Sequence, residues 1–194
     1  MNLHRRQLLL TPLLLALAGP AAALQLAGVG IPESVEQDGI TLLRNGAGVR
    51  RFLLFNVYVA ALYLERPATQ PQPIVNMPGP KLLRLVLLRD LPATELLERL
   101  ESGMRANVEA ELLAQLQPET ERLRQRFTSH PPLRRGQVVD LRWLPQQGTL
   151  ISVDQQPLGS AEPDPRLYQA LLQVWLGPQP ADSRLKQALL GAAI

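Results

Sequence analysis

Residues 45–64 read NGAGVRRFLLFNVYVAALYL, and the class of fold is most visible in this segment. Asn45 to Gly48 is typical of a turn, because its two glycines can adopt positive φ. Val49 to Leu64 is a long apolar and aromatic run, which favours a strand over a helix. A further strand is predicted over Lys81 to Arg89, which is apolar on both faces except at Arg84. Such a strand is expected to be central in its sheet.

The spacing of the apolar residues changes after this strand. From Pro92 to Gln117 they recur every three or four positions with charged residues between them, which predicts one amphipathic helix of about seven turns. Pro118 opens a second, polar helix that reaches about Phe127. Between the two strands, Pro67 to Pro80 holds five prolines and is predicted to be a loop.

The rest of the chain adds a hairpin and two helices. Residues 137–144 alternate between apolar and polar and turn into residues 149–153, which predicts a β-hairpin. Residues 164–175 and 180–190 each open with helix-start signals. This order of elements indicates an α+β fold, in which helices cover one side of an antiparallel sheet. Such a sheet and the long helix can enclose an apolar cleft, which is the default place for a binding site.

The N-terminus has the three parts of an export signal. Basic residues at 4–6 precede an apolar run, and the alanines at 21–23 form an A-x-A site that predicts cleavage before Leu24. The alternative is a membrane anchor, but the run is well short of the roughly 20 residues that a spanning helix needs. We therefore expect a signal peptide at residues 1–23 and a periplasmic domain at residues 24–194, with no stable membrane span after cleavage.

The composition excludes several kinds of chemistry. The chain has no cysteine and two histidines, which rules out disulfides, thiol catalysis and a multi-histidine metal site, so no cofactor or metal is predicted. Without the two arginines of residues 1–23, 18 Lys and Arg stand against 17 Asp and Glu, a net charge of +1. The arginines clustered over residues 122–135 lie beside glutamates, as on a solvated helix face. No nucleic-acid partner is expected, because such a protein carries a clustered basic surplus.

The order of these segments, and the residues within them, resemble the chalcone isomerase family, above all its exported bacterial chalcone isomerase-like members. Residues 45–64 are similar to the family's glycine turn, arginine and VYxxxLYL strand. Residues 81–91 are similar to its central strand leading into the long helix, and residues 174–189 to its C-terminal helix pair. The likeness spans residues 39–191, roughly the whole chain after the export signal. It implies an open-faced β-sandwich, an antiparallel sheet packed by a layer of helices.

The resemblance implies one of two activities. The plant enzymes of the family cyclise a chalcone to a flavanone, using an arginine together with Tyr, Asn and Thr side chains. Non-catalytic relatives resemble fatty-acid-binding proteins, in which the arginine, helped by a tyrosine, holds a carboxylate at the mouth of an apolar tunnel. The family arginine falls on Arg50. The enzyme's tyrosine, asparagine and C-terminal-helix threonine fall on Leu96, Gly103 and Val174. Its strand threonine falls near Tyr58. Only the arginine survives, so the resemblance implies a binder without catalytic residues.

Arg50 and Tyr58 are the predicted ligand-binding residues. A strand arginine that projects into a cleft offers a forked, permanently charged donor for a carboxylate. Neighbouring residues alternate faces, so Arg51 is an equally plausible inward arginine from the residues alone. Tyr58 shares a face with Arg50 in an unbroken strand but lies about 26 Å away, so cooperation needs a turn or a bulge between them. Tyr63 has the opposite parity and is predicted to be packing.

Three functions remain open from the sequence. The first is a periplasmic, non-catalytic binder of a small apolar ligand with an acidic head, such as a fatty acid. The second is an isomerase or intramolecular lyase that acts on a chalcone-like enone through Arg50. The third is an envelope interaction protein with a closed cleft. Trp143 and Trp175 are predicted to be core residues, and His130 lacks a partner for catalysis.

Overall fold

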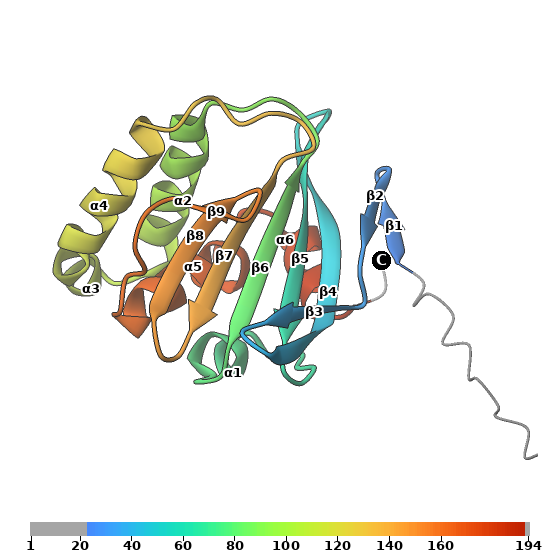
Figure 1. Ribbon diagram of the computed structural model, residues 1–194, viewed down its shortest axis with the longest axis horizontal. Coiled ribbons are helices and arrows are strands. Elements are labelled where there is room, and N and C mark those ends of the chain that lie inside the picture. The colour runs from blue at the N-terminus through green and yellow to red at the C-terminus, as the bar shows by residue number, and fades with distance from the viewer. Residues whose placement is uncertain (1–22, 193–194) are drawn as a thin grey trace, which may run out of the picture.

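Seven strands form one antiparallel sheet at the centre of the protein, in a computed structural model that describes residues 23–192 (Figure 1). Their spatial order is β3-β4-β5-β6-β7-β8-β9, so strands that are consecutive in the chain are neighbours. They are β3 (Ser34–Gln37), β4 (Ile40–Phe52), β5 (Phe55–Leu64), β6 (Lys81–Leu87), β7 (Val138–Leu144), β8 (Gly148–Val153) and β9 (Gln156–Pro157). The predicted central strand is confirmed, because β6 is the fourth of the seven.

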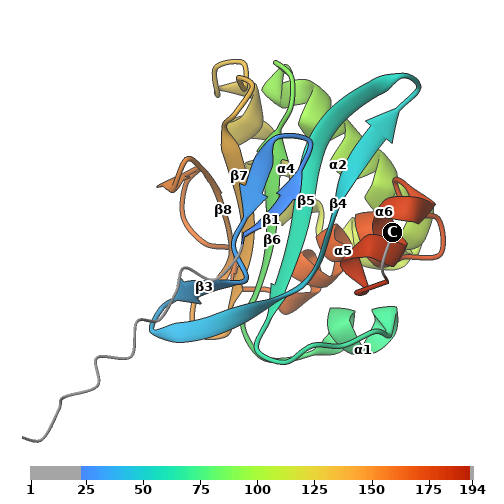
Figure 2. The ribbon, with the colours of Figure 1, turned by 90° about the vertical axis from the view of Figure 1, so that its right-hand side faces the viewer.

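Helices cover one face of this sheet, as the predicted α+β fold requires (Figures 1 and 2). They are α1 (Pro71–Asn76), α2 (Ala93–Asn107), α3 (Ala110–Gln115), α4 (Gln117–Thr128), α5 (Pro165–Leu176) and α6 (Ser183–Leu189). The main hydrophobic core lies between the helices and this face, and it contains Leu100 of α2 and Trp175 of α5. The helical layer thus supplies one wall of any cleft on this side.

The opposite face of the sheet carries a second, smaller core that the sequence pattern does not predict. A separate hairpin of β1 (Leu24–Leu26) and β2 (Val29–Ile31) lies over it (Figure 2). The guanidinium of Arg44 donates to the carbonyl of Ile31 at 2.7 Å, and the Tyr63 hydroxyl donates to the carbonyl of Pro32 at 3.1 Å. These bonds fasten the N-terminal segment to the sheet, and Tyr63 is packing, as predicted.

The segment at residues 45–64 forms a hairpin, which corrects two predictions. Residues 45–48 are part of β4 and not a turn, and Gly46 has no positive φ. Gly46 is needed for the close approach of α6, because a Cβ there would lie 2.0 Å from the carbonyl oxygen of Ala188 near the end of that helix. The real turn is at Leu53 and Leu54, which divides the expected single strand into β4 and β5. The turn cannot be predicted from composition, because its two residues are leucines within a continuous apolar run.

The long predicted helix is also divided. α2 ends at Asn107, whose side-chain amide donates to the carbonyls of Gly103 and Gln179, each at 2.8 Å. Val108 then adopts an extended backbone, and the chain turns into α3 and α4. The apolar spacing continues through this break, so periodicity alone does not reveal it. The predicted loop at residues 67–80 likewise contains the short helix α1.

The N-terminal predictions fall largely on residues that the structure does not describe. The expected signal peptide at residues 1–23 lies outside the described residues, apart from its last position. Within residues 23–192, no helix has the length and apolar character to cross a bilayer.

Candidate functional site

The β4–β5 hairpin brings the two predicted ligand-binding residues together. Arg50 and Tyr58 are direct register partners across the hairpin, with a β-bulge immediately after Arg50. In a continuous strand they would have been about 26 Å apart. The turn at residues 53–54 therefore supplies the reversal that their cooperation needs. Arg51, the alternative inward arginine, is exposed and does not line the cleft.

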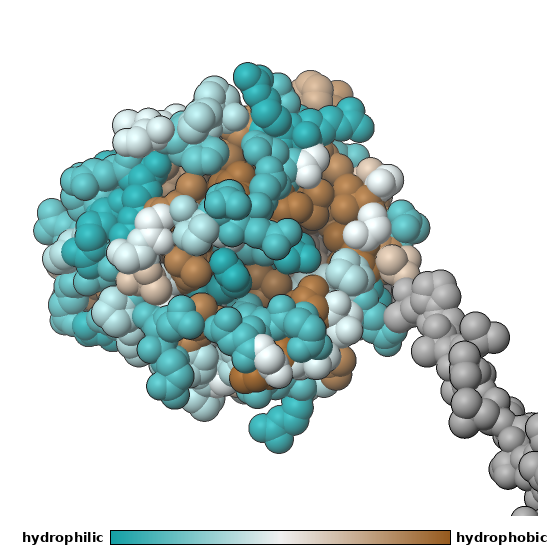
Figure 3. All heavy atoms as spheres, in the orientation of Figure 1, coloured by the Kyte–Doolittle hydropathy of each residue, from teal (hydrophilic) through white to brown (hydrophobic). Residues whose placement is uncertain are grey.

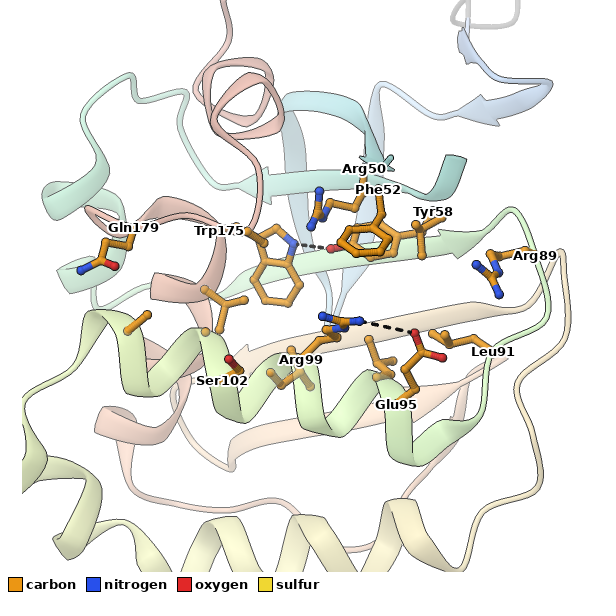
Figure 4. Close-up of a pocket in the computed structure, with 17 residues that line it drawn as sticks. Arg50, Phe52, Tyr58, Arg89, Leu91, Glu95, Arg99, Ser102, Trp175 and Gln179 are labelled. Carbon is orange, nitrogen blue, oxygen red and sulfur yellow. Dashed lines mark hydrogen bonds and ion pairs between the residues drawn. The ribbon is translucent and has the colours of Figure 1, made fainter. Parts of the chain in front are cut away.

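A pocket of about 260 Å³ lies between this hairpin, α2 and α5 (Figure 4). Its volume is just below the range of about 300–1,000 Å³ that is usual for small-molecule sites. It is lined by Arg50, Phe52, Val57, Tyr58, Arg89, Leu91, Glu95, Leu96, Arg99, Leu100, Ser102, Gly103, Ala106, Val174, Trp175, Gln179 and Ala181. Apolar side chains form most of this lining, and the charged ones are three arginines and one glutamate. The pocket is thus mostly apolar and carries an excess of positive charge on its wall.

Arg50 is held in place by one weak ion pair. Its Nη1 lies 3.4 Å from Oδ2 of Asp182 and also donates to the carbonyl of Arg51. The other carboxylate oxygen of Asp182 accepts from the backbone N–H groups of Arg184 and Leu185, which caps α6. Within residues 23–192, all hydrogen bonds of the guanidinium use Nη1. Nε and Nη2 are therefore left for a ligand.

Tyr58 is buried beside Trp175 and Arg50. Its hydroxyl accepts from Nε1 of Trp175 at 3.0 Å, as the dashed line in Figure 4 shows. Burial raises the pKa of Tyr58 to about 12, although the Trp175 hydrogen bond and the nearby Arg50 charge act in the opposite direction. The phenol is thus protonated at neutral pH and retains its own O–H to donate. Trp175 is a core residue, as predicted, and also orients the tyrosine.

Arg99 of α2 is not among the predicted site residues, yet it lines the pocket with a side chain that is mostly exposed (Figure 4). Its guanidinium carbon lies 5.2 Å from the centre of the Phe52 ring, and its Nη2 lies 3.9 Å from a carboxylate oxygen of Glu95. A signal for it exists, because Leu96 and Gly103 are seven residues apart on one helix face and Arg99 lies between them. A second cation therefore accompanies Arg50 in the pocket.

The positions that carry the enzyme's other side chains in the family resemblance all line the pocket. Leu96 and Gly103 come from α2, Val174 from α5 and Tyr58 from β5. A Cβ on Gly103 would lie 2.6 Å from a methyl group of Val174, so the glycine permits the close approach of the two helices. At Leu96, Gly103 and Val174 the pocket wall offers no side-chain donor or acceptor. The polar network expected of a cyclising enzyme is thus replaced by apolar contact.

Other residues considered from the sequence have structural roles. Trp143 is buried and donates from its Nε1 to the carbonyl of Pro78 at 3.0 Å. In the described part of the chain, the side chain of His130 makes one hydrogen bond, between its Nδ1 and the carbonyl of Pro131. The expected solvated face at residues 122–135 is only partly correct, because Arg122 and Arg126 both reach the buried Glu162 at 2.7 Å. No group of acidic, histidine or cysteine residues in the described part could hold a metal ion.

Comparisons with known proteins identify the family of the chain and a solved structure of similar fold. The profile of the chalcone isomerase-like family matches residues 23–191, so the chain belongs to that family. A fatty-acid binding protein of Arabidopsis thaliana, known from its crystal structure, has a similar fold. Its TM-score is 0.61 and its sequence identity 15%, over 84% of this chain and 92% of that one. No curated protein matches the sequence. The family and the fold predicted from the sequence are both confirmed.

Proposed function

We propose that this protein is an exported, periplasmic and non-catalytic binder of a small apolar ligand with an acidic head, of the fatty-acid type. The apolar chain lies along the wall formed by α2 and α5, and the acidic head pairs with Arg50 and accepts from the Tyr58 hydroxyl. The observation that carries this proposal is the pairing of a partly free guanidinium with a buried, protonated phenol at one wall of an apolar pocket.

The energetics of the site support an acidic ligand. A charge-assisted hydrogen bond to a carboxylate contributes about 1.5–3 kcal/mol, and each buried CH₂ about 0.8 kcal/mol before ordering costs. Arg50, Arg89 and Arg99 line the pocket against one carboxylate, that of Glu95, so an anionic head meets a net positive wall. The similar fold of a fatty-acid binding protein also supports a binder.

Two observations disfavour the alternatives. The isomerase needs polar side chains where this chain has Leu96, Gly103 and Val174. The interaction protein with a closed cleft needs a filled pocket, whereas the space beside Trp175 is hollow. Turnover of a chalcone-like enone that is lost in Arg50→Ala would restore the enzyme as the better explanation.

The first test is the ligand that the exported protein carries. The protein is purified from a bacterial periplasm, its intact mass is measured under native and denaturing conditions, and the bound molecule is extracted. The native mass is expected to exceed the denatured mass by that of a fatty acid. The denatured mass also locates the N-terminus and thereby tests the predicted cleavage before Leu24.

The second test separates the head group from the apolar chain. Arg50→Gln is expected to weaken binding of a fatty acid by about ten- to a hundredfold but to leave its methyl ester nearly unaffected, because the ester carries no charge. The matched control is Arg51→Gln, which removes a neighbouring exposed arginine that does not line the pocket. Equal weakening of acid and ester by Arg50→Gln, in a variant with native circular dichroism, would contradict the proposed role.

A further inference from the structure

The tip of the β4–β5 hairpin consists of four large apolar residues in a row. Phe52, Leu53, Leu54 and Phe55 are 44%, 82%, 97% and 60% exposed. The tip projects beyond the sheet, because β6 pairs with β5 only from Tyr58 onward (Figure 1). Apolar side chains are visible at this upper end of the molecule in Figure 3. A continuous apolar surface of this kind on a projecting turn marks an interaction site.

The turn is also poorly suited to its own sequence. Leu53 has a φ of +52°, in the left-handed region that glycine and asparagine occupy more readily. A leucine therefore sits where it is strained and almost fully in water. Neither the stability of the turn nor its solubility explains the apolar side chains at this place.

The hairpin is amphipathic along its length. From the tip inward, its first rung is Leu53 and Leu54, its second Phe52 and Phe55, and its third Arg51 and Asn56. Two apolar rungs span about 7 Å at 3.3 Å per residue. An interfacial segment buries its apolar part by about 5–10 Å, with basic side chains at the level of the headgroups. The dimensions and the polarity of the tip match that arrangement.

The surrounding loops carry positive charge. The β4–β5, β6–α2 and α4–β7 connections lie at the same end of the antiparallel sheet (Figures 1 and 2). Residues 51–56, 88–92 and 129–137 contain four arginines and one acid, Asp90. Asp90 is paired with Arg134 at 3.0 Å, and Arg51 and Arg89 are exposed. Nearby acids on the adjoining elements are Glu95, Glu98, Asp154 and Asp182. Glu95 is paired with Arg99, and Asp182 is paired with Arg50. The loops that face outward beside the tip are thus basic.

We propose that this hairpin tip docks the protein on the surface of a phospholipid bilayer that contains anionic lipids. The two leucines and two phenylalanines enter the interface, and the arginines of the neighbouring loops contact the headgroups. A bilayer suits this tip better than a protein partner does, because the apolar group is narrow and convex and is backed by a basic rung.

Because the tip lies at the rim of the pocket, docking would also serve ligand transfer, an inference that rests on the proposed function. Phe52 belongs both to the tip and to the pocket lining, where its ring contacts the guanidinium of Arg99. A docked protein therefore holds the pocket rim next to the bilayer. A fatty acid can pass between bilayer and pocket along Phe52 with little exposure of its chain to water.

Vesicle binding tests the docking. The exported protein is incubated with vesicles of phosphatidylcholine with phosphatidylglycerol, or of phosphatidylcholine alone, and the bound fraction is measured by sedimentation. The tip variant is Leu53→Asn with Leu54→Ser, which suits the positive φ at the first position. The matched control is Ile40→Ser with Leu43→Ser, since both residues are 40% exposed on the distal half of β4. All variants share one N-terminus, so differences between them report on the substituted positions.

The wild type and the control are expected to bind the anionic vesicles, and the tip variant at least about tenfold more weakly. Binding to phosphatidylcholine alone is expected to be weaker for every variant. Equal binding by the tip and control variants, or no binding by the wild type, would overturn the docking. A wild type that elutes as a dimer while the tip variant is a monomer would also overturn it and would assign the tip to self-association.

Fatty-acid affinity measured without vesicles distinguishes a failure of membrane docking from a failure of the proposed fatty-acid binding. The tip variant is expected to retain it, because Leu53 and Leu54 do not line the pocket. Loss of vesicle binding with intact fatty-acid affinity supports docking. Vesicle binding by a wild type that takes up no fatty acid would support docking but overturn the proposed function.

Discussion

Two arginine–aspartate pairs lie on opposite faces of the same sheet, and their geometries differ. On the face covered by the β1–β2 hairpin, Arg84 donates twice to Asp140, each time at 2.8 Å. On the helix-covered face, Arg50 approaches Asp182 with a single nitrogen at 3.4 Å. The first pair joins two neighbouring strands, β6 and β7, whereas the second joins the end of β4 to the N-cap residue of α6.

The difference separates an arginine whose donors are used within the fold from an arginine that keeps donors on a pocket wall. Arg84 and Asp140 satisfy one another with a bidentate pair, and the carboxylate side chain is only 6% exposed. Arg50 retains donors and lies on a pocket wall, and Asp182 divides its carboxylate between the arginine and the helix cap. We call the bidentate Arg84–Asp140 pair closed, because its members satisfy one another, and the Arg50–Asp182 pair open, because Arg50 keeps donors that face the pocket.

The largest expected effect comes from breaking the closed pair. Arg84→Leu leaves the Asp140 carboxylate buried without its partner, so the free energy of unfolding is expected to fall by about 3 kcal/mol. Urea denaturation measures this change. The double variant Arg84→Leu with Asp140→Leu is expected to recover much of the loss, because it removes both charges. A single variant as stable as the wild type would show that this pair is not structural.

A smaller effect is expected from the two tyrosines that face these pairs. Tyr58→Phe removes the donor to the ligand's acidic head and is expected to weaken fatty-acid binding about tenfold. Tyr63→Phe is the matched control, because Tyr63 is buried on the other face and donates to Pro32. Burial raises the pKa of both to about 12, so the difference between the variants is expected to persist from about pH 6 to pH 9. Isothermal titration measures the affinities, and equal affinities would contradict the role of Tyr58.

The smallest effect is expected from opening the second pair further. Asp182→Asn removes the carboxylate that competes for Arg50, and asparagine caps a helix as well as aspartate does. Fatty-acid affinity is therefore expected to rise about threefold while stability stays nearly constant. The same titration measures it, with the methyl ester as the control ligand. Weaker binding by Asp182→Asn would mean that the aspartate orients Arg50 for the ligand.

From the sequence, two residues that line the pocket could be named, but not the local structure around them; their role in ligand binding stays a prediction. Arg50 and Tyr58 were found from the family pattern, and both line the pocket. The turn at residues 53–54 was missed, because an all-leucine turn carries none of the glycine or asparagine signals of a hairpin. Arg99 was not predicted, because it is an exposed charged residue on an amphipathic helix, and only the hairpin opposite makes that exposed position part of a pocket.

By itself, the sequence determined the class of fold, the central strand and the family, because apolar periodicity and segment order are local properties of the chain. Only the tertiary structure decided that Arg50 and Tyr58 are partners and that Arg84 is closed off while Arg50 stays open. It also decided that Gly46 and Gly103 serve close approach. These outcomes depend on which distant segment lies opposite each residue, and contact across the fold sets the environment of a charge more strongly than its neighbours in the chain do.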